Sequence, residues 1–436
     1  MSKESKKKPR VLLVNPPIYD FTAYDFWLKP YGLLRVAGQL RDRAELELFD
    51  YVDRLHPAAE GTLKEDRWGR GQFLSTQIPK PAVLAAIPRR YHRFGLPRSH
   101  LLKLLESKGP FDVVLIQTVM TYWYLGVLEV IEDLRRHSPR SRIVLGGNYA
   151  TLCPDHAGGL GADLVIRGND LHPLGELLSI DLAPGELPFW EGYPRLATGV
   201  LRLTEGCPFR CTYCSVPQVQ PSFNGRLSAA LSEFHQLRLL GVRRLAFYDD
   251  ALLFRERNLL LPFLEEGEAS GADIELHTPN ALNARFITKE VASRMVTAGF
   301  GSFYLGFESS SYEWQRQTGS KVYSDELASA VEQLLRAGAR ADQISAYLII
   351  AHRAADHQQA EESMLFARDL GIRVMLSEFS PIPGTPDGEI CRRWVDLDEP
   401  LWHNKTVFPL MFLGAKEGTR LKGFSRELNR TLSPAA

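Results

Sequence analysis

Three cysteines are crowded into one short stretch of the sequence. The segment EGCPFRCTYCSVP, Glu205–Pro217, holds Cys207, Cys211 and Cys214 in a C-x3-C-x2-C spacing, in a chain of 436 residues with five cysteines. The proline and arginine between them are typical of a loop, which disfavours cysteines packed as small apolar side chains. Structural zinc takes four ligands, usually in spaced pairs. An iron–sulfur cluster takes thiolates at short spacings, and three of them leave one iron open to a ligand. The spacing favours a cluster, with zinc as the weaker alternative.

The second half of the chain predicts the elements that position this loop. Six apolar stretches alternate with helical ones, and the cysteines follow the first of them: GVLRLTE, RRLAFYDD, DIELHTPN, SFYLGFES, ISAYLIIA and RVMLSEFS. This alternation predicts a parallel (βα)6 partial barrel over residues 199–380, preceded by a proline-rich linker at 182–198. In such barrels the site lies on the loops that follow the strands. Residues 381–436, aromatic and proline-rich, are expected to cap one end.

The first half also alternates strands and helices. It predicts an α/β fold with a doubly wound, Rossmann-like parallel sheet over residues 1–181, interrupted by an insertion at about 53–110. Ligands of such sheets lie at the carboxyl ends of the strands. The expected ends are Asn15, Gln117–Thr121, Gly146–Tyr149 and Gly168.

The cysteine segment resembles the radical SAM superfamily. CPFRCTYC matches its C-x3-C-x-aromatic-C signature, with Tyr213 at the aromatic position. The resemblance implies a [4Fe-4S] cluster on the three cysteines, S-adenosylmethionine (SAM) on the open iron, and a 5′-deoxyadenosyl radical as the reactive species. It further implies that Tyr213, Asp249, Asp250 and Glu308 contact SAM. Either aspartate alone could equally be a helix N-cap. His352-Arg353 stand where many relatives carry glycine, so the adenine contact there is left open.

An α/β domain ahead of such a barrel resembles the cobalamin-binding class of radical SAM proteins. By this resemblance, a corrinoid would lie against Thr118, Thr121, the Gly146-Gly147 turn and Tyr149. The D-x-H-x-x-G motif of corrinoid proteins that ligate cobalt from below is missing, because NPPIYDFTAYDFW follows the first strand and holds no histidine. A plain flavodoxin-like scaffold without corrinoid is the alternative.

Composition limits the partners. Lys plus Arg and Asp plus Glu are 52 each, so the zero net charge gives no signal for nucleic acid. No apolar run reaches the roughly 20 residues of a membrane span. Five cysteines, three of them clustered, do not suggest a disulfide framework, and a cytoplasmic location is expected. Cys153 and Cys391 are expected to be single reduced thiols.

The predicted function is radical SAM catalysis, with cobalamin-dependent methyl transfer to an unactivated carbon of a small molecule as the most specific hypothesis. The resemblance implies an electron donor of the flavodoxin or ferredoxin type as partner. The alternatives are cyclisation, rearrangement or oxidation without methyl transfer, and an iron–sulfur protein that binds or senses without catalysis. The acidic residues at two strand ends disfavour the last, because a sensor does not need to hold SAM.

Overall fold

The computed structural model describes residues 7–59, 63–182, 187–271, 273–352 and 357–432. Arg353 therefore lies outside the described residues. The chain divides into two compact units. The first unit comprises residues 1–85 and 89–196, and the second comprises residues 86–88 and 197–436. Among the described residues, no helix is both long and apolar enough to cross a membrane.

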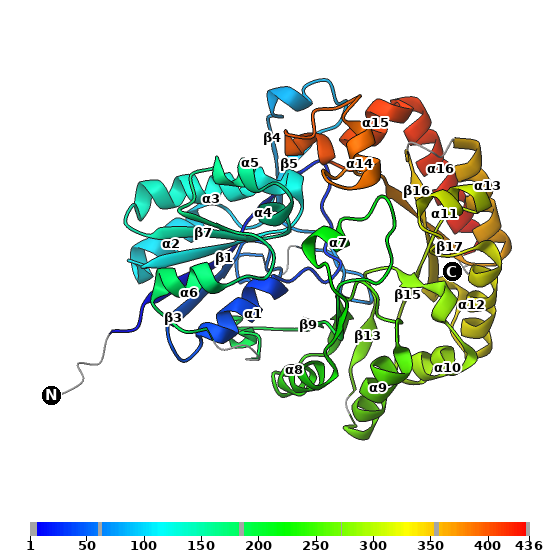
Figure 1. Cartoon of the computed structure of the whole chain (residues 1–436), viewed down its shortest axis with the longest axis horizontal. Coiled ribbons are helices and arrows are strands. Elements are labelled where there is room, and N and C mark those ends of the chain that lie inside the picture. The colour runs from blue at the N-terminus through cyan, green and yellow to red at the C-terminus, as the bar shows by residue number, and fades with distance from the viewer. Residues whose placement is uncertain (1–6, 60–62, 183–186, 272, 353–356, 433–436) are drawn as a thin grey trace. The chain divides into compact units, whose positions relative to one another are not determined.

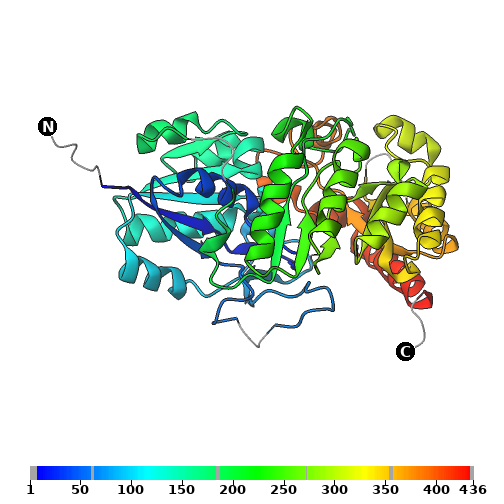
Figure 2. The ribbon, with the colours of Figure 1, turned by 90° about the horizontal axis from the view of Figure 1, so that it is seen from below.

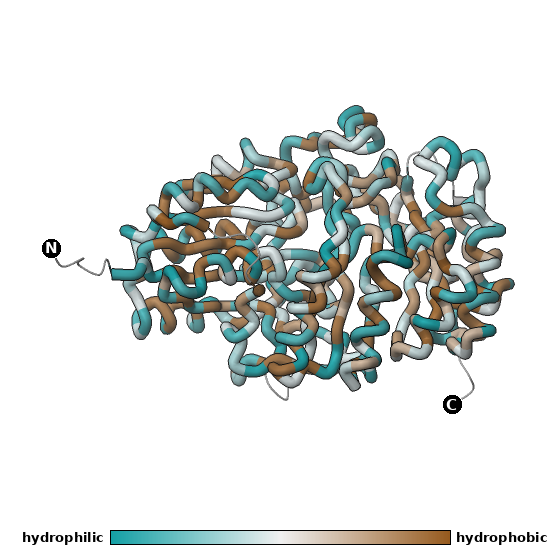
Figure 3. The backbone as a smooth tube through the Cα atoms, turned by 60° about the horizontal axis from the view of Figure 1, so that its bottom comes forward, coloured by the Kyte–Doolittle hydropathy of each residue, from teal (hydrophilic) through white to brown (hydrophobic). Residues whose placement is uncertain are grey.

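The first unit is built on a five-stranded parallel sheet of order β3-β1-β6-β7-β8 (Figure 1). Its strands are β1 (Arg10–Asn15), β3 (Glu45–Asp50), β6 (Val113–Thr118), β7 (Arg142–Gly147) and β8 (Leu164–Ile166). Its helices are α1 (Tyr31–Leu40), α2 (Ser99–Lys108), α3 (Tyr124–His137), α4 (Asn148–Leu152), α5 (Pro154–Gly158) and α6 (His172–Leu178). The central strands β1, β6 and β7 are mostly buried, as expected for a sheet covered on both faces. Figure 3 shows hydrophobic and hydrophilic stretches alternating along the chain. The next strand after β1 in this sheet, β3, lies on one side of β1, and the later strands β6, β7 and β8 lie on its other side. The direction of winding therefore reverses between β1 and β6.

The expected insertion carries secondary structure of its own. Strands β5 (Tyr91–Phe94) and β4 (Ser75–Ile78) form an antiparallel sheet with β2 (Ile18–Asp20), in the order β2-β5-β4. Arg93 of β5 forms a buried ion pair with Glu129 of α3, with 2.7 Å between the closest nitrogen and oxygen. This ion pair ties the insertion to the parallel sheet's own helices.

The second unit holds two parallel sheets. One has the order β13-β12-β9 and the other β14-β15-β16-β17. Their strands are β9 (Thr198–Leu201), β12 (Arg244–Phe247), β13 (Glu275–His277), β14 (Leu282–Asn283), β15 (Phe303–Glu308), β16 (Ile344–Ile350) and β17 (Arg373–Glu378). The stretch expected as the third barrel strand therefore contributes β13 to the first sheet, while β14 begins the second. A short antiparallel pair, β10 (Thr204–Glu205) with β11 (Asn224–Gly225), flanks the cysteine loop.

Helices alternate with these strands, as the sequence pattern predicts. They are α7 (Val216–Val219), α8 (Leu227–Leu239), α9 (Leu260–Ala269), α10 (Lys289–Thr297), α11 (Tyr312–Thr318), α12 (Ser324–Arg336), α13 (His357–Asp369), α14 (Pro386–Cys391), α15 (Val407–Leu413) and α16 (Ala415–Thr431). In the C-terminal segment, α16 packs against α13 and β17 (Figure 2), and the expected cap stays a prediction. The Asn429 amide exchanges two 2.8 Å hydrogen bonds with the backbone of Val374, so α16 covers the edge of this sheet.

Candidate functional site

The cysteine loop lies between β10 and α7, and close backbone packing fixes its path. Gly206 has φ +72°, and a Cβ there would collide with the carbonyl oxygen of Ser222. Gly319, with φ +120°, approaches from the other side, where a Cβ would lie 3.0 Å from the Cα of Cys211. Both positions require glycine because of the positive φ and the lack of space.

The three cysteines are free, half-buried thiols that lie close enough to influence one another. Burial raises the pKa of all three, and that of Cys214 to about 11, with Lys321 partly opposing the rise. Such thiols are protonated at neutral pH unless a metal centre supplies positive charge. Within the described residues, no three donor side chains converge on a single metal ion. A four-iron cluster instead takes each thiolate on a separate iron. Three neighbouring thiols on one fixed loop fit that requirement.

Glu308, predicted to contact SAM, ends β15 beside this loop and is 6% exposed. Its φ is +69°, an uncommon and strained value for glutamate that is typical of functional positions. The Glu308 carboxylate pairs with Lys321, with 3.0 Å between Oε1 and Nζ. Burial alone would lower the pKa of Lys321, but Glu308 and Cys211 outweigh that effect and raise it. A Cβ on Gly306 would lie 2.6 Å from Lys321 Nζ, so this glycine leaves space for the lysine on β15.

Asp249 and Asp250 follow β12 and differ in their hydrogen bonds and in the charged groups near them. Asp249 Oδ1 accepts hydrogen bonds from the backbone and hydroxyl of Thr204, at 2.5 and 2.7 Å, while its Oδ2 is buried with no partner in the described chain. Burial raises the pKa of Asp249 to about 7. Burial also raises the pKa of Asp250, which Arg202 partly offsets. Asp250 acts electrostatically on Cys207, so it lies near the cysteine loop. Neither aspartate caps a helix by its side chain.

Tyr213 packs against a cluster of buried side chains. Its ring stacks on Trp314 with 5.9 Å between centroids, and it meets His352 edge-on at 6.2 Å. Its contact with SAM remains a prediction.

The sequence reasoning missed Lys321 and Arg202 altogether. Arg202 lies directly after β9, and its Nε is buried without a partner in the described residues. Arg202, directly after a strand, and Lys321, between α11 and α12, carried no motif that could have marked them.

In the first unit, the predicted corrinoid contacts follow β6 and β7 at the carboxyl edge of the sheet. Thr118 Oγ1 donates to Gly146 O at 3.0 Å and accepts from Ala150 N at 3.1 Å, so its hydroxyl binds the two strands together. Gly147 has φ +113°, and a Cβ there would collide with the Thr118 carbonyl. Thr121 is buried in the turn after β6.

Tyr149 differs from its prediction. It is completely buried, and its hydroxyl lies 2.6 Å from His156 Nδ1. Helix α4 begins directly after the Gly147 turn and directs this ring into the interior, so the side chain is not exposed to a ligand. The single thiols Cys153 and Cys391 are free and buried.

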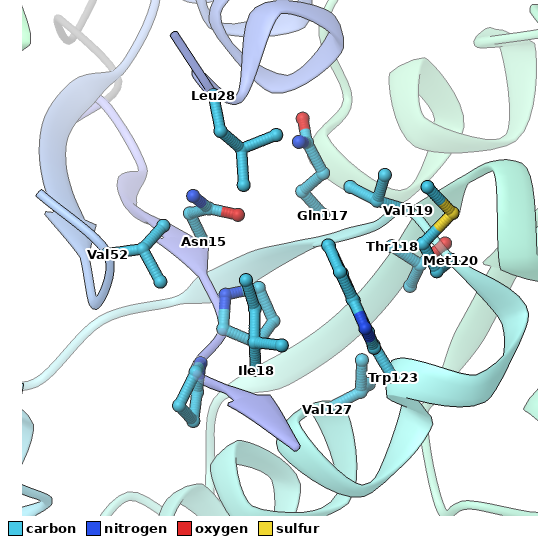
Figure 4. Close-up of a pocket in the computed structure, with 12 residues that line it drawn as sticks. Asn15, Ile18, Leu28, Val52, Gln117, Thr118, Val119, Met120, Trp123 and Val127 are labelled. Carbon is cyan, nitrogen blue, oxygen red and sulfur yellow. The ribbon is translucent and has the colours of Figure 1, made fainter. Parts of the chain in front are cut away.

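A small cleft, open to solvent, lies between the carboxyl ends of β1 and β6, where the direction of winding reverses (Figure 4). Its lining is Asn15, Pro16, Pro17, Ile18, Leu28, Val52, Gln117, Thr118, Val119, Met120, Trp123 and Val127. Doubly wound sheets bind ligands at such reversals. Of the residues predicted for the corrinoid, Thr118 alone lines this cleft.

Two amide side chains in the cleft have fixed orientations. Asn15 Nδ2 donates to Asp50 Oδ1 at 2.8 Å, which leaves the Asn15 carbonyl oxygen free to face the cleft (Figure 4). Gln117 Oε1 accepts from Leu33 N at 3.1 Å, so the amide nitrogen of Gln117 remains as a donor. The cleft thus offers one acceptor and one donor among apolar walls.

Three thiols on a glycine-bounded loop, with acidic residues at neighbouring strand ends, form the arrangement that was predicted for an iron–sulfur and SAM site, on an α/β framework of parallel sheets. The chain matches the profile of the Radical SAM superfamily over residues 201–392. The prediction of a radical SAM domain is confirmed, and such domains use a [4Fe-4S] cluster and SAM.

The chain is also similar to a curated protein and to solved structures. The chain is 25% identical over 212 residues to a protein described as "Uncharacterized methyltransferase PH0819" of Pyrococcus horikoshii. That match spans 48% of this chain and 44% of the relative, so the chain covers less than half of the relative's length.

Two solved structures share the fold. The radical SAM methyltransferase TsrM of Kitasatospora setae, solved with tryptophan and a SAM analogue, is 16% identical with a TM-score of 0.65, covering 88% of this chain and 76% of TsrM. The cobalamin-dependent SAM radical enzyme OxsB, solved with aqua-cobalamin and SAM, is 14% identical with a TM-score of 0.57. That match covers 97% of this chain and 61% of OxsB.

Proposed function

We propose that this chain is a cobalamin-dependent radical SAM methyltransferase that methylates an unactivated carbon of a small molecule. The observation that carries the proposal is the combination of the cysteine loop in one unit with an open cleft at the winding reversal of the other. The fold likeness to TsrM and OxsB, which extends over both units, supports it. In this proposal the two sheets of the second unit together make a (βα)6 partial barrel at residues 199–380, and the first unit is a Rossmann-like cobalamin domain.

Each unit has a distinct task in this proposal. When bound, the cluster supplies the electron that splits SAM into methionine and a 5′-deoxyadenosyl radical, and cobalamin supplies a methyl carrier. Cys207, Cys211 and Cys214 hold the cluster. Asp250 contacts the SAM amino group, Glu308 contacts the ribose or methionine part of SAM, and Lys321 pairs with the Glu308 carboxylate. The ordered side chains hold both SAM and substrate in one pose, which is the main contribution of a protein to such chemistry.

The cleft of the first unit is the proposed corrinoid site. A corrinoid carries several amide side arms, and the free acceptor of Asn15 and free donor of Gln117 are complementary to a primary amide. The apolar walls suit the flat ring. No histidine is among the residues that line the described cleft, so the proposal assigns no lower cobalt ligand to it.

The electron donor is a flavodoxin- or ferredoxin-type protein, and the reaction takes place in the cytoplasm. The proposed domain limits are those expected from the sequence: 1–181, 182–198, 199–380 and 381–436.

Two variants test the proposal, because one is expected to lose only the corrinoid and the other only the cluster. Met120 lines the cleft and is 43% exposed, so Met120→Trp narrows the entrance without disturbing the core. The protein is produced with cobalamin, purified anaerobically and reconstituted with iron and sulfide. We expect Met120→Trp to lose the corrinoid absorbance but keep four irons per chain, and Cys211→Ala to show the reverse. Tyr312→Trp, at a 68% exposed position of the second unit, is the matched control and should keep both.

The outcomes separate the competing functions. If the wild-type protein shows no corrinoid absorbance, cobalamin-dependent methyl transfer is contradicted. A radical reaction without methyl transfer, such as cyclisation, rearrangement or oxidation, is then favoured. Wild-type protein that holds a cluster but releases no 5′-deoxyadenosine on reduction with SAM would contradict radical SAM chemistry and favour a sensor.

A further inference from the structure

A chain of buried polar groups connects the cysteine loop to the C-terminal segment. We call it the Asp387 network, and its members are Trp314, His352, Asp387 and Thr212. Trp314 Nε1 lies 3.1 Å from His352 Nδ1, and His352 Nε2 lies 2.9 Å from Asp387 Oδ2. Thr212 Oγ1 donates to the same carboxylate oxygen at 2.5 Å. Thr212 is the residue directly after Cys211 in the cluster loop.

The hydrogen-bond chemistry of the network fixes the state of His352. An indole nitrogen is a donor only, so His352 Nδ1 must accept from Trp314 and carries no hydrogen. The hydrogen of the neutral ring is therefore on Nε2, which donates to Asp387. Both His352 and Asp387 have no exposed surface, and a carboxylate so deeply buried requires good donors. The network consequently has one direction, with every donor leading to Asp387.

The backbone around the network is shaped to hold it. Ala351, directly before His352, has φ +63°, which is unfavourable for alanine and turns the chain at the end of β16. The Asp387 backbone nitrogen donates to the carbonyl of Thr212 at 3.1 Å, and Thr212 N donates to Thr318 O at 3.1 Å. Thr212 is thus bound through its nitrogen, its oxygen and its hydroxyl. Strain of this kind is retained where the surroundings fix one conformation.

We propose that His352 is a positioning residue for the iron–sulfur cluster. By donating from Nε2 it holds the Asp387 carboxylate on Thr212, and so fixes the segment between Cys211 and Cys214 in the conformation that presents both thiolates to the cluster. The C-terminal segment, through α14, is then an integral part of the cluster site. The inference rests on the proposed function only in that the three cysteines bind a cluster.

Two substitutions at His352 separate its two hydrogen bonds. The amide nitrogen of His352→Gln takes the place of Nε2, so this variant keeps the donor to Asp387 and loses the acceptor for Trp314. The carbonyl oxygen of His352→Asn takes the place of Nδ1, so this variant keeps the acceptor and loses the donor. Thr212→Val has the same shape as threonine and removes the donor at the other end of the network.

The measurement is the rate at which the anaerobically reconstituted enzyme loses iron to a chelator. We expect iron loss about tenfold faster in His352→Asn and in Thr212→Val, since each removes a hydrogen bond to a buried charge. His352→Gln should stay within about threefold of wild type. Because both act through Asp387, the double variant should be no faster than about the faster single variant. The electron paramagnetic resonance signal of the reduced cluster should broaden in the two fast variants only.

The matched control is His403, which is also completely buried in the C-terminal segment and has its Nε2 3.0 Å from Leu397 O. His403→Asn should lower the melting temperature and leave iron loss and the cluster spectrum unchanged. Equal acceleration in His403→Asn, a His352→Gln variant as fast as His352→Asn, or wild-type rates in His352→Asn would each overturn the inference. A wild-type protein that binds no cluster would instead contradict the proposed function.

Discussion

Asp249 is predicted to weaken the fold at neutral pH while serving the site. Its Oδ1 holds Thr204, whereas its Oδ2 is buried with no partner in the described chain. Asp249→Asn keeps a carbonyl oxygen for the Thr204 backbone nitrogen and removes the buried charge. We therefore expect the variant to be more stable than wild type at high pH and to bind SAM no better.

The magnitude follows from the pKa. Burial raises the pKa of Asp249 from 3.8 to about 7, a change of about three units, or about 4 kcal/mol at high pH. Because the folded pKa is the higher one, the folded state binds more protons between these values. Stability is therefore fully present below pH 3.8 and falls as the pH rises to about 7. About half of the loss, about 2 kcal/mol, falls between pH 5.5 and 8.5. In the variant this pH dependence is absent.

The assay is thermal unfolding of wild type and variant at the two pH values. We expect the melting temperature of Asp249→Asn, relative to wild type, to rise by about 4–8 °C from pH 5.5 to pH 8.5. Asp273→Asn, at an exposed position of the same unit, is the control and should show no such trend. A difference between Asp249→Asn and wild type that is the same at both pH values would refute the reasoning, because the carboxylate would then be ionised in the folded protein throughout.

Three further predictions concern other parts of the chain. Lys321→Met leaves the Glu308 carboxylate buried without its partner and should lower the melting temperature by about 6–12 °C, equivalent to about 3 kcal/mol; an unchanged value would mean that water reaches the carboxylate. Gly147→Ala, at φ +113°, should cost at least about 2 kcal/mol in chemical unfolding, whereas Gly158→Ala, where a Cβ meets nothing within 4 Å, should not. Asn429→Ala should speed hydrogen exchange of the β17 edge at least about fivefold, and unchanged exchange would show that α16 protects that edge by packing alone.

The sequence identifies the cluster ligands because their spacing is local. Cys207, Cys211 and Cys214 lie on one loop, and their geometry requires no knowledge of distant residues. The ends of the strands can also be predicted from the sequence, because apolar runs closed by polar residues mark the carboxyl edge of a parallel sheet. Asp250 and Glu308, which were chosen as SAM contacts because they end strands, lie near the cysteine loop although they come from different strands, and their contact with SAM stays a prediction.

Long-range contacts explain what the sequence reasoning missed. Asp387 lies 175 residues from Thr212, and no local pattern indicates that the C-terminal segment returns to the cysteine loop. Lys321 belongs to an ordinary turn, and its role depends on Gly306, which leaves space on a strand formed earlier in the chain. Tyr149 was misjudged because the first turn of a short helix decides whether the ring faces a ligand or the interior.

Some polar side chains at the ends of strands have hydrogen-bonding capacity that the described part of the chain does not use. Thr118 and His352 also lie at the proposed sites, but their side chains hydrogen-bond to other groups of the protein. In contrast, Asn15, Gln117 and Asp249 each use one atom to fix their orientation and leave the other available. Half-satisfied groups of this kind are unfavourable when buried, and a ligand relieves that cost. They occur at the carboxyl ends of strands in both units, which is where the cofactors are proposed to bind.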